Sequence, residues 1–459
     1  MEIEAVGVVA LILGGLCLAA GPSVSVVIFF ISTVFGAAAA IVLPALGFVS
    51  ITPAHLLLGF VALESVIRRD WARRALGCFQ AGRAGLWLLF TAIYTIAMAF
   101  FVPRLLEGLT YVYAVARTQI GAAILLLPLA PVAGNVTQTI YFVGDLVCFV
   151  VFYGHASAPG GLKTMAKAGV ACAAFNLALG GVDLLTYWTG TADWMQFIRN
   201  ANYTMLNDTT VEGFKRIVGA FPEASAYAYA TLGLFAFTVK LWLQSIWKRF
   251  TGPIAGLSFL ALVFSTSTTA YGGLALFCCA LYIERLLALL TRPVSREAVA
   301  LVTVVPLLGL LLAACIALDS SAVMFVQDIV DKTLLTKLST DSGVTRVMWN
   351  NQAFTNFVET YGLGAGVGSV RASSFLAAVP GSVGVIGSLG YGAFLYTALR
   401  PGPPDTADPF ALAVRRAARW ACFALLIGAS IAGSFIDLGL PFFIFAAMAC
   451  ARSGGKSDR

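Results

Sequence analysis

Long apolar segments recur along the whole chain, and short polar segments separate them. Most apolar segments are about 20 residues long, the length that an α-helix needs to cross the hydrocarbon of a bilayer. Backbone groups inside a bilayer must pair within the protein, and segments of this length favour helices over a β-barrel. The pattern predicts an all-α fold: a polytopic transmembrane helical bundle of about 12–14 spans, in a single membrane domain covering residues 1–459.

The expected spans follow the apolar segments and have approximate bounds 5–20, 24–45, 52–67, 84–103, 137–155, 168–188, 225–246, 252–270, 271–290, 298–318, 374–399, 420–436 and 438–451. The segment 111–133 is apolar but contains Arg117, Gln119 and two prolines. We therefore expect it to be re-entrant or to lie along the outer interface. No basic residue flanks the first span, so a cleavable signal peptide is not expected.

Composition and charge agree with a membrane protein. Hydrophobic residues make up 59% of the chain and charged residues 11%, whereas a soluble domain carries about a quarter charged residues. The net charge of +7 comes from Lys and Arg in short loops, which the positive-inside rule assigns to the cytoplasmic face. The expected partner is therefore the lipid bilayer and not a nucleic acid. The cytoplasmic basic loops are 68–74, 163–167, 247–249, 285–296, 400–419 and 452–459.

Two longer loops then face the outer side, at 189–225 and 319–373. In the second loop, the charges of 328–332 and 345–351 are spaced as on an amphipathic helix. We expect short helices there.

The segment Lys215–Ser225 joins fixed cations to small residues where a span begins. A guanidinium stays charged and offers a planar fork of donors that matches phosphate oxygens. Pro222 can begin a helix, and Glu223 then lies in its first turn, where a carboxylate suits the helix dipole. The segment predicts an anion site around Arg216, or else a helix-capping turn whose cations reach lipid phosphates.

The second outer loop carries two candidate segments. Arg346 precedes Trp349 by three residues and is followed by amide side chains. This pattern suits sugar-phosphate binding and equally an interfacial anchor. In Gly364–Ser374, glycines alternate with small residues before Arg371 and a pair of serines. Such a segment forms an anion cradle at a helix start or packs tightly between membrane helices.

Other polar residues are weaker candidates. Hydroxyls of Ser265–Gly273, at an outer turn, can bond back to the helix backbone. The segment Asn135–Gln138 lies at the outer end of an expected span, and it suits either contact with a sugar or a helix cap. Intramembrane acids are costly unless paired or near water, although two of them lie at span ends, where water can reach them. These acids are Asp145, Asp183 and Asp437.

We expect no metal and no cofactor. His55 and His155 are expected near opposite faces, which disfavours a histidine metal pair or a catalytic triad. The outer loops contain no Asp-x-Asp sequence, and the nine cysteines lack metal-ligand spacing, so they are expected as buried hydrophobes.

Four segments, in this order and spacing, resemble bacterial exopolysaccharide polymerases of the O-antigen polymerase and O-antigen ligase superfamily, which are GT-C-like membrane glycosyltransferases. The resemblance covers roughly residues 130–395 and rests on Gly134–Gln138, Arg216–Tyr227, Ser265–Tyr271 and Gly366–Ser374. It implies transfer of a glycan from undecaprenyl pyrophosphate to a hydroxyl of another lipid-linked repeat unit. The expected location is the periplasmic face of the bacterial inner membrane, with a chain-length regulator and a flippase of the same pathway as possible partners.

The resemblance also implies residue roles. In the family, an arginine of the Arg-x-x-Gly-x-Phe type engages the donor pyrophosphate, and Arg216 matches it. Arg346 matches a second arginine that precedes the Gly-rich stretch. The candidate catalytic residues are Arg216, Glu223 and Arg346. The candidate substrate-binding residues are Lys215, Ser225, Tyr227, Arg371, Ser369, Ser373, Ser374, Asn135 and Gln138.

The expected chemistry needs little beyond positioning and charge. Pyrophosphate is a good leaving group, so arginines can stabilise it without a metal. A general base for the acceptor hydroxyl is desirable. Glu223 is the first candidate, and Glu359 and Asp341 are the next candidates.

Two alternatives stay open. The first is an O-antigen ligase-type transferase, although such ligases carry a histidine near the end of the second loop, where this chain has Arg371 and serines. The second is a lipid-linked oligosaccharide flippase, although a flippase needs cations inside a central cavity and the arginines here lie on outer loops. We also find no internal repeat of the kind that transporters show.

Overall fold

The computed structural model describes residues 2–44, 49–118, 121–203, 205–211, 213–291, 341–401 and 408–452, together with isolated residues between 299 and 327. The helices have these bounds: α1 Ala5–Ala20, α2 Pro22–Ser32, α3 Pro53–Val66, α4 Arg69–Leu76, α5 Ala84–Leu105, α6 Ala133–Ala156, α7 Gly161–Trp188, α8 Ala224–Leu243, α9 Lys248–Phe264, α10 Thr268–Thr291, α13 Asp341–Glu359, α14 Phe375–Leu399, α15 Pro409–Ala432 and α16 Leu440–Cys450.

The protein is a polytopic α-helical bundle, as the apolar pattern predicts. Within the described residues, six helices are long and apolar enough to cross a bilayer: α5, α6, α7, α8, α10 and α14. Shorter apolar helices accompany them, namely α1, α2, α3 and α16. Most of the expected span 298–318 lies outside the described residues.

The core of the bundle surrounds α16. Nearly every residue of this short helix is buried, which suits a helix that is apolar on all sides. It packs against α6, α14 and α15, while α8 packs against α15 and α9. Phenylalanines fill the centre; Phe394 stacks on Phe443 with ring centroids 5.9 Å apart.

The expected span 24–45 is wrong in its second half. Helix α2 ends at Ser32, and the chain then turns and enters strand β2 (Ile41–Leu43). This strand pairs antiparallel with β1 (Glu2–Ile3) and with β3 (Val49–Ile51). The turn is tied to the first outer loop, because the Ala37 N–H donates to the Ala220 carbonyl (2.9 Å). Hydrophobicity alone did not separate a strand from the continuation of a helix.

The segment 111–133, which we expected to be re-entrant or to lie along the outer interface, is mostly β-strand. It contains an antiparallel hairpin of β4 (Tyr111–Thr118) and β5 (Gly121–Pro128), followed by the start of α6. Strand β4 packs against α13. The amides of two α13 side chains, Gln352 and Asn356, donate to the Tyr111 carbonyl. A β-hairpin is marginal alone, and this contact supports it.

Helix α14 is broken at Gly384, which has φ 61° and ψ −158°. The break frees carbonyl groups that the second outer loop uses: Gly381 O accepts from Ala365 N (2.8 Å) and Ser382 O from Gly366 N (3.0 Å). In return, Val385 N donates to Gly362 O (2.9 Å). Non-helical backbone inside a membrane domain is tolerable where protein groups satisfy it in this way.

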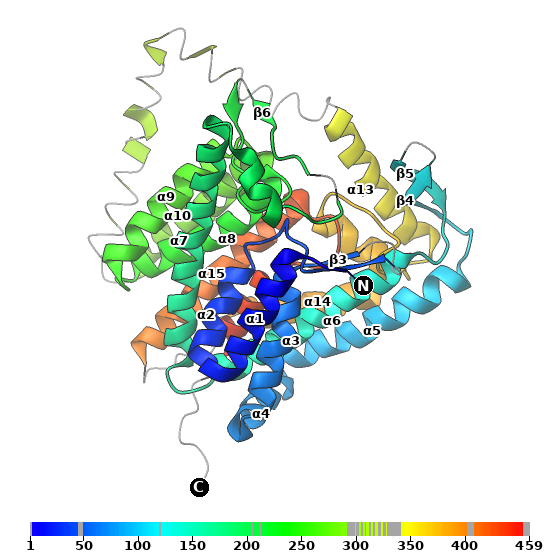
Figure 1. Ribbon diagram of the computed structural model, residues 1–459, viewed down its shortest axis with the longest axis horizontal. Helices are drawn as coiled ribbons and strands as arrows, with labels where there is room; N and C mark the ends of the chain where they lie inside the picture. The colour runs from blue at the N-terminus through cyan, green and yellow to red at the C-terminus, as the bar shows by residue number, and fades with distance from the viewer. Residues whose placement is uncertain are drawn as a thin grey trace.

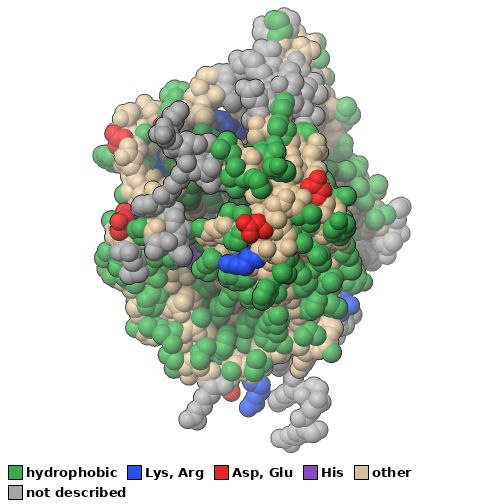
Figure 2. All heavy atoms as spheres, turned by 90° about the vertical axis from the view of Figure 1, so that its right-hand side faces the viewer, with side chains coloured by type: hydrophobic (Ala, Val, Ile, Leu, Met, Phe, Trp, Pro, Cys, Tyr) green, Lys and Arg blue, Asp and Glu red, His purple; other side chains and the backbone are tan. Residues whose placement is uncertain are grey.

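The two ends of the molecule differ (Figure 1). The pair β6 (Thr210–Val211) and β7 (Phe214–Lys215), the hairpin and α13 gather at one end, and α4 lies at the other. We name these the β6 end and the α4 end. Between them, Figure 2 shows a broad band of hydrophobic side chains, with most of the visible acidic side chains above it.

Candidate functional site

The first outer loop is shaped by Asp183, near the end of α7. This carboxylate is 1% exposed; it forms an ion pair with Arg199 (2.6 Å) and lies 3.6 Å from the Lys215 ammonium. Its second oxygen accepts hydrogen bonds from the N–H groups of Val218 (2.8 Å) and Gly219 (3.1 Å). The turn 215–219 therefore wraps around one buried anion.

Arg199 belongs to the same network and was not identified from the sequence. Its guanidinium also donates to the Gly219 carbonyl. We expected Asp183 to be solvated at the end of a span; instead two cations compensate it. A carboxylate within a membrane segment needs such a partner. That requirement could have predicted an ion pair between Asp183 and the cations of the following loop.

Lys215 and Tyr227, two of the candidate substrate-binding residues, are both buried. The Lys215 ammonium is buried and donates to the carbonyls of Asn207 and Arg216. Burial lowers the pKa of Lys215, and the Asp183 charge opposes that change. Tyr227 is 0% exposed and lies behind the turn, where a Cβ built on Gly219 would meet its ring at 3.1 Å.

The charge of Arg216 interacts with residues outside this internal network. Its side chain is partly exposed, and its Nε is buried without a hydrogen-bond partner among the described residues. Burial lowers the pKa of Arg216, the Glu223 carboxylate raises it, and the Arg346 guanidinium lowers it again. The two arginines from different outer loops are thus close enough for their charges to interact, as an anion shared between them requires.

Glu223 and Ser225 lie at the start of α8 beside Arg216. Glu223 is the residue that precedes the helix, and it does not lie in the first turn as expected. Its carbonyl accepts from Ala226 N and Tyr227 N, which opens the helix. The Ser225 hydroxyl donates to the Glu223 carboxylate. Both side chains are partly exposed.

The turn between α9 and α10 brings hydroxyl groups toward the same place. Ser265 bonds back to the Leu262 carbonyl (2.7 Å), as expected for a structural turn. The hydroxyls of Thr266, Ser267 and Thr269 behave differently: they are buried and have no hydrogen-bond partner among the described residues. Tyr271, one helical turn after Ser267, interacts electrostatically with Arg216. Buried hydroxyls without partners are uncommon in proteins.

The second loop adds Arg346 and Arg371. Helix α13 confirms the amphipathic helix expected at 345–351; residues 328–332 lie outside the described residues. Arg346 and Trp349 are three residues apart, so they lie on one face of α13. The Arg371 guanidinium lies 4.7 Å from the centre of the Trp349 ring. Tyr113 of the hairpin also lies near Trp349, with its ring centroid 6.4 Å from that of Trp349.

Arg371 resembles Arg216 in its surroundings. Its Nε is also buried without a hydrogen-bond partner among the described residues, and burial lowers its pKa. Three guanidinium groups, from Arg216, Arg346 and Arg371, thus lie at the β6 end, two of them with unused donors.

The remaining candidate binding residues join segments to one another. The Asn135 amide donates to the Val367 carbonyl (2.7 Å) and to the Ser369 hydroxyl (2.8 Å), and both side chains are buried. Ser373 N donates to Asn350 of α13 (2.8 Å). Ser374 caps α14 and donates to the Ser430 carbonyl (2.7 Å). These four residues make contacts within the protein, whereas Gln138 is partly exposed on α6.

The other candidate bases are less well placed than Glu223. Glu359 accepts a hydrogen bond from the Thr110 hydroxyl where α13 meets the hairpin. Asp341 is the first residue of α13, and its side chain lies outside the described residues. Asp145 of α6 is buried beside Asp437, with which its carboxylate interacts.

Histidines and cysteines do not gather at this site. His55 bonds to the Thr52 hydroxyl (2.8 Å) and His155 to the Ser65 hydroxyl (2.9 Å). Among the described residues, the cysteines are free thiols, and no group of three His, Cys, Asp or Glu side chains could hold a metal ion.

The arrangement suits a ligand with several negative charges. Partly buried guanidinium groups with unused donors are costly unless an anion compensates them, and hydroxyls beside them add neutral donors. Comparison of the chain with protein-family models, with curated proteins and with solved structures found no match.

Proposed function

We propose that the chain is a polysaccharide polymerase that transfers a glycan from undecaprenyl pyrophosphate to a hydroxyl of another lipid-linked repeat unit. The observation that carries the proposal is that the charges of Glu223 and Arg346 both shift the pKa of Arg216, although Arg346 belongs to the other outer loop. The resemblance of the four outer segments to exopolysaccharide polymerases gives that cation cluster its substrate. By the positive-inside rule, the β6 end faces the periplasm.

In the proposed reaction, the acceptor hydroxyl oxygen attacks the anomeric carbon of the donor sugar. A new glycosidic C–O bond forms, and the bond between the anomeric carbon and the pyrophosphate oxygen breaks. Arg216 and Arg346 stabilise the negative charge that the leaving pyrophosphate gains. Glu223 takes the proton of the acceptor hydroxyl and later releases it to water.

The proposal reduces the set of substrate-contacting residues. It keeps the partly exposed side chains of Arg216, Glu223, Ser225, Arg346 and Arg371, with Gln138 as a further contact. It adds the hydroxyls of Thr266, Ser267 and Thr269 as phosphate donors, because they lack internal partners among the described residues. The buried residues Lys215, Tyr227, Asn135, Ser369 and Ser373 then hold these groups in place.

The test is an Arg216→Lys variant in the native host. An ammonium keeps the charge but lacks the planar fork of donors, so we expect loss of polymer while the protein stays inserted and abundant. Arg249→Lys is the matched control: this exposed arginine lies at the start of α9, at the α4 end, and polymer should be unchanged. Normal chain length in Arg216→Lys would contradict the proposal.

Analysis of lipid-linked glycans in a deletion strain separates the polymerase from a flippase. Loss of a polymerase leaves single repeats accumulating on the periplasmic side. Trapping of those repeats on the cytoplasmic side would instead indicate transport.

A further inference from the structure

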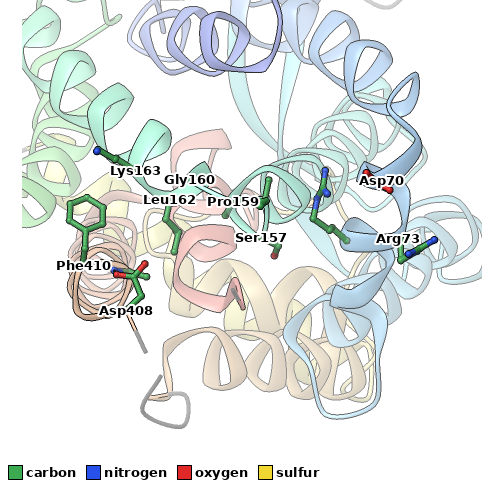
Figure 3. Close-up of a pocket in the computed structure, with 13 residues that line it drawn as sticks. Asp70, Arg73, Ser157, Pro159, Gly160, Leu162, Lys163, Asp408 and Phe410 are labelled. Carbon is green, nitrogen blue, oxygen red and sulfur yellow. The ribbon is translucent and has the colours of Figure 1, made fainter. Parts of the chain in front are cut away.

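A cavity of about 830 Å³ lies at the α4 end, at the opposite end of the molecule from strand β6. Figure 3 shows how three segments surround it: α4 with Asp70 and Arg73, the turn between α6 and α7 with Ser157 and Pro159, and the start of α15 with Phe410. The proposed polymerase reaction uses none of these residues.

Cationic side chains line the cavity from two helices. Arg73 and Arg74 belong to the last turn of α4, and Lys163 to the first turn of α7. The Nε of Arg74 is buried and has no hydrogen-bond partner among the described residues. Two carboxylates also line the cavity. Asp408 is committed to capping α15, since it accepts from Ala411 N (3.1 Å), and Asp70 is exposed.

Ser157 provides a second, independent sign of a ligand. It lines the cavity and is 8% exposed, and its hydroxyl has no hydrogen-bond partner among the described residues. A buried hydroxyl without a partner loses its bonds to water without replacement. A ligand oxygen in the cavity would supply the missing bond.

The start of α7 adds backbone donors to the same cavity. No side chain caps this helix, and the residue before it is Gly160 in the left-handed region. Helix geometry leaves the N–H groups of Leu162 and Lys163 without intrahelical acceptors, and the positive end of the helix dipole favours an anion there. The nearby α15 differs, because Asp408 already caps it.

The walls of the cavity are held in position without a ligand. Trp71 of α4 is nearly buried, packs against Gly154 of α6, and donates to the Val151 carbonyl (3.3 Å). Leu162 and Phe410 give the cavity an apolar side. The site thus joins cations and hydroxyl to apolar surface at the edge of a membrane domain.

From this geometry we infer that the cavity binds a phosphate group, carried either by the head group of an anionic phospholipid or by a soluble phosphate compound. Arg74 and Lys163 neutralise the charge, while the Ser157 hydroxyl and the first amides of α7 bond to the phosphate oxygens. The site is independent of the proposed polymerase activity.

The test uses the purified full chain and two probes. The first is phosphatidylglycerol, compared with phosphatidylcholine, in mixed micelles, with retained lipid measured by native mass spectrometry. The second is inorganic phosphate without lipid, measured by the shift of the thermal midpoint. We expect the double variant Arg74→Gln/Lys163→Gln to bind about tenfold more weakly, because each change removes a charge-assisted hydrogen bond. Arg249→Gln removes an exposed cation at the same end and should bind normally.

The outcomes are separable. Phosphatidylglycerol binding that depends on Arg74 and Lys163 assigns the site to a lipid head group, and an equal dependence for inorganic phosphate assigns it to a soluble compound. Equal binding of both probes by the wild type, the double variant and Arg249→Gln overturns the inference. If the double variant folds poorly, Ser157→Leu fills the cavity and keeps both charges. Wild-type binding by that variant would also overturn it.

Discussion

The two outer turns that bring cations to the β6 end are held by different forces. The turn 215–219 wraps around the buried carboxylate of Asp183, which compensates Arg199 and Lys215. The segment 362–368 is held mostly by backbone contacts instead: it bonds to the broken helix α14 at Gly381 and Ser382 and touches α6 at Gly134, with one further bond from the Asn135 side chain to the Val367 carbonyl.

This difference determines how each turn can be disrupted. A buried ion network concentrates its stabilisation in a few groups, so one substitution leaves charges without partners. A backbone-to-backbone contact depends on the absence of side chains, so an added Cβ disrupts it. The first turn should be sensitive to loss of charge and the second to added volume.

The largest effect is expected from Asp183→Asn. The amide can still accept from Val218 and Gly219, but Arg199 and Lys215 lose their compensating charge. Removing one partner of a buried ion pair costs about 3–5 kcal/mol. We expect a clear fall in the thermal midpoint of the purified protein and faster proteolysis within residues 205–223.

Asp193→Asn is the matched control for this substitution. Asp193 is exposed in the same loop and accepts a hydrogen bond from Gln196 (2.6 Å). A surface change of this kind has little effect on stability. Equal midpoints for the two variants would show that charge does not hold the turn.

The next largest effect is expected from Gly384→Ala, which tests the backbone contact. The Cβ would lie 2.1 Å from the Gly362 carbonyl oxygen, in a backbone conformation that essentially only glycine adopts. Such strain and overpacking cost about 1–3 kcal/mol each. The same thermal measurement should show a fall.

Gly392→Ala, in the same helix, is the control for Gly384→Ala. A Cβ built there meets no atom within 4 Å, and alanine favours a helix over glycine by roughly 0.5–1 kcal/mol. Its midpoint should be unchanged or higher. A fall of the same size in both variants would argue against the proposed role of the break in α14.

The smallest effect is expected from Trp349→Phe, which weakens the contact with Arg371. A cation–π contact contributes about 0.5–1 kcal/mol at an accessible site, and phenylalanine retains part of it. We expect a small fall in midpoint and a partial loss of polymer. The control is Trp194→Phe, which changes a tryptophan of the first loop that is 75% exposed and should leave both properties unaltered. An equal loss in the control would contradict the proposed role of Arg371.

Much of the fold could be predicted because it follows from local properties. Segments such as 84–103 and 374–399 are apolar over the required length, and helices α5 and α14 occupy them. The second half of the segment 24–45 was misjudged, and the strands of 111–133 were not foreseen, because β-branched and apolar residues suit both strands and membrane helices. Only the pairing of Ile41–Leu43 with β1 and β3, and of β4 with β5, shows that these segments are strands.

The candidate site was predictable in part for a similar reason. Arg216 and Arg346 were identified by residue type and position in the outer loops. Arg199 and the hydroxyls of Thr266, Ser267 and Thr269 were not, because their importance depends on which partners they have or lack.

By itself, the amino-acid sequence determined that this chain is a multi-span helical membrane protein with most of its cations between the apolar segments. Those properties follow from the free energy of each segment in lipid or in water, which depends on composition and length. Only the tertiary structure decided which cations are compensated internally and which keep unused donors. Lys215 and Arg216 are adjacent in the chain, yet one lies against Asp183 and the other interacts with Arg346. Electrostatic interactions depend on distance in space, and the packing of α7, α8 and α13 determines that distance.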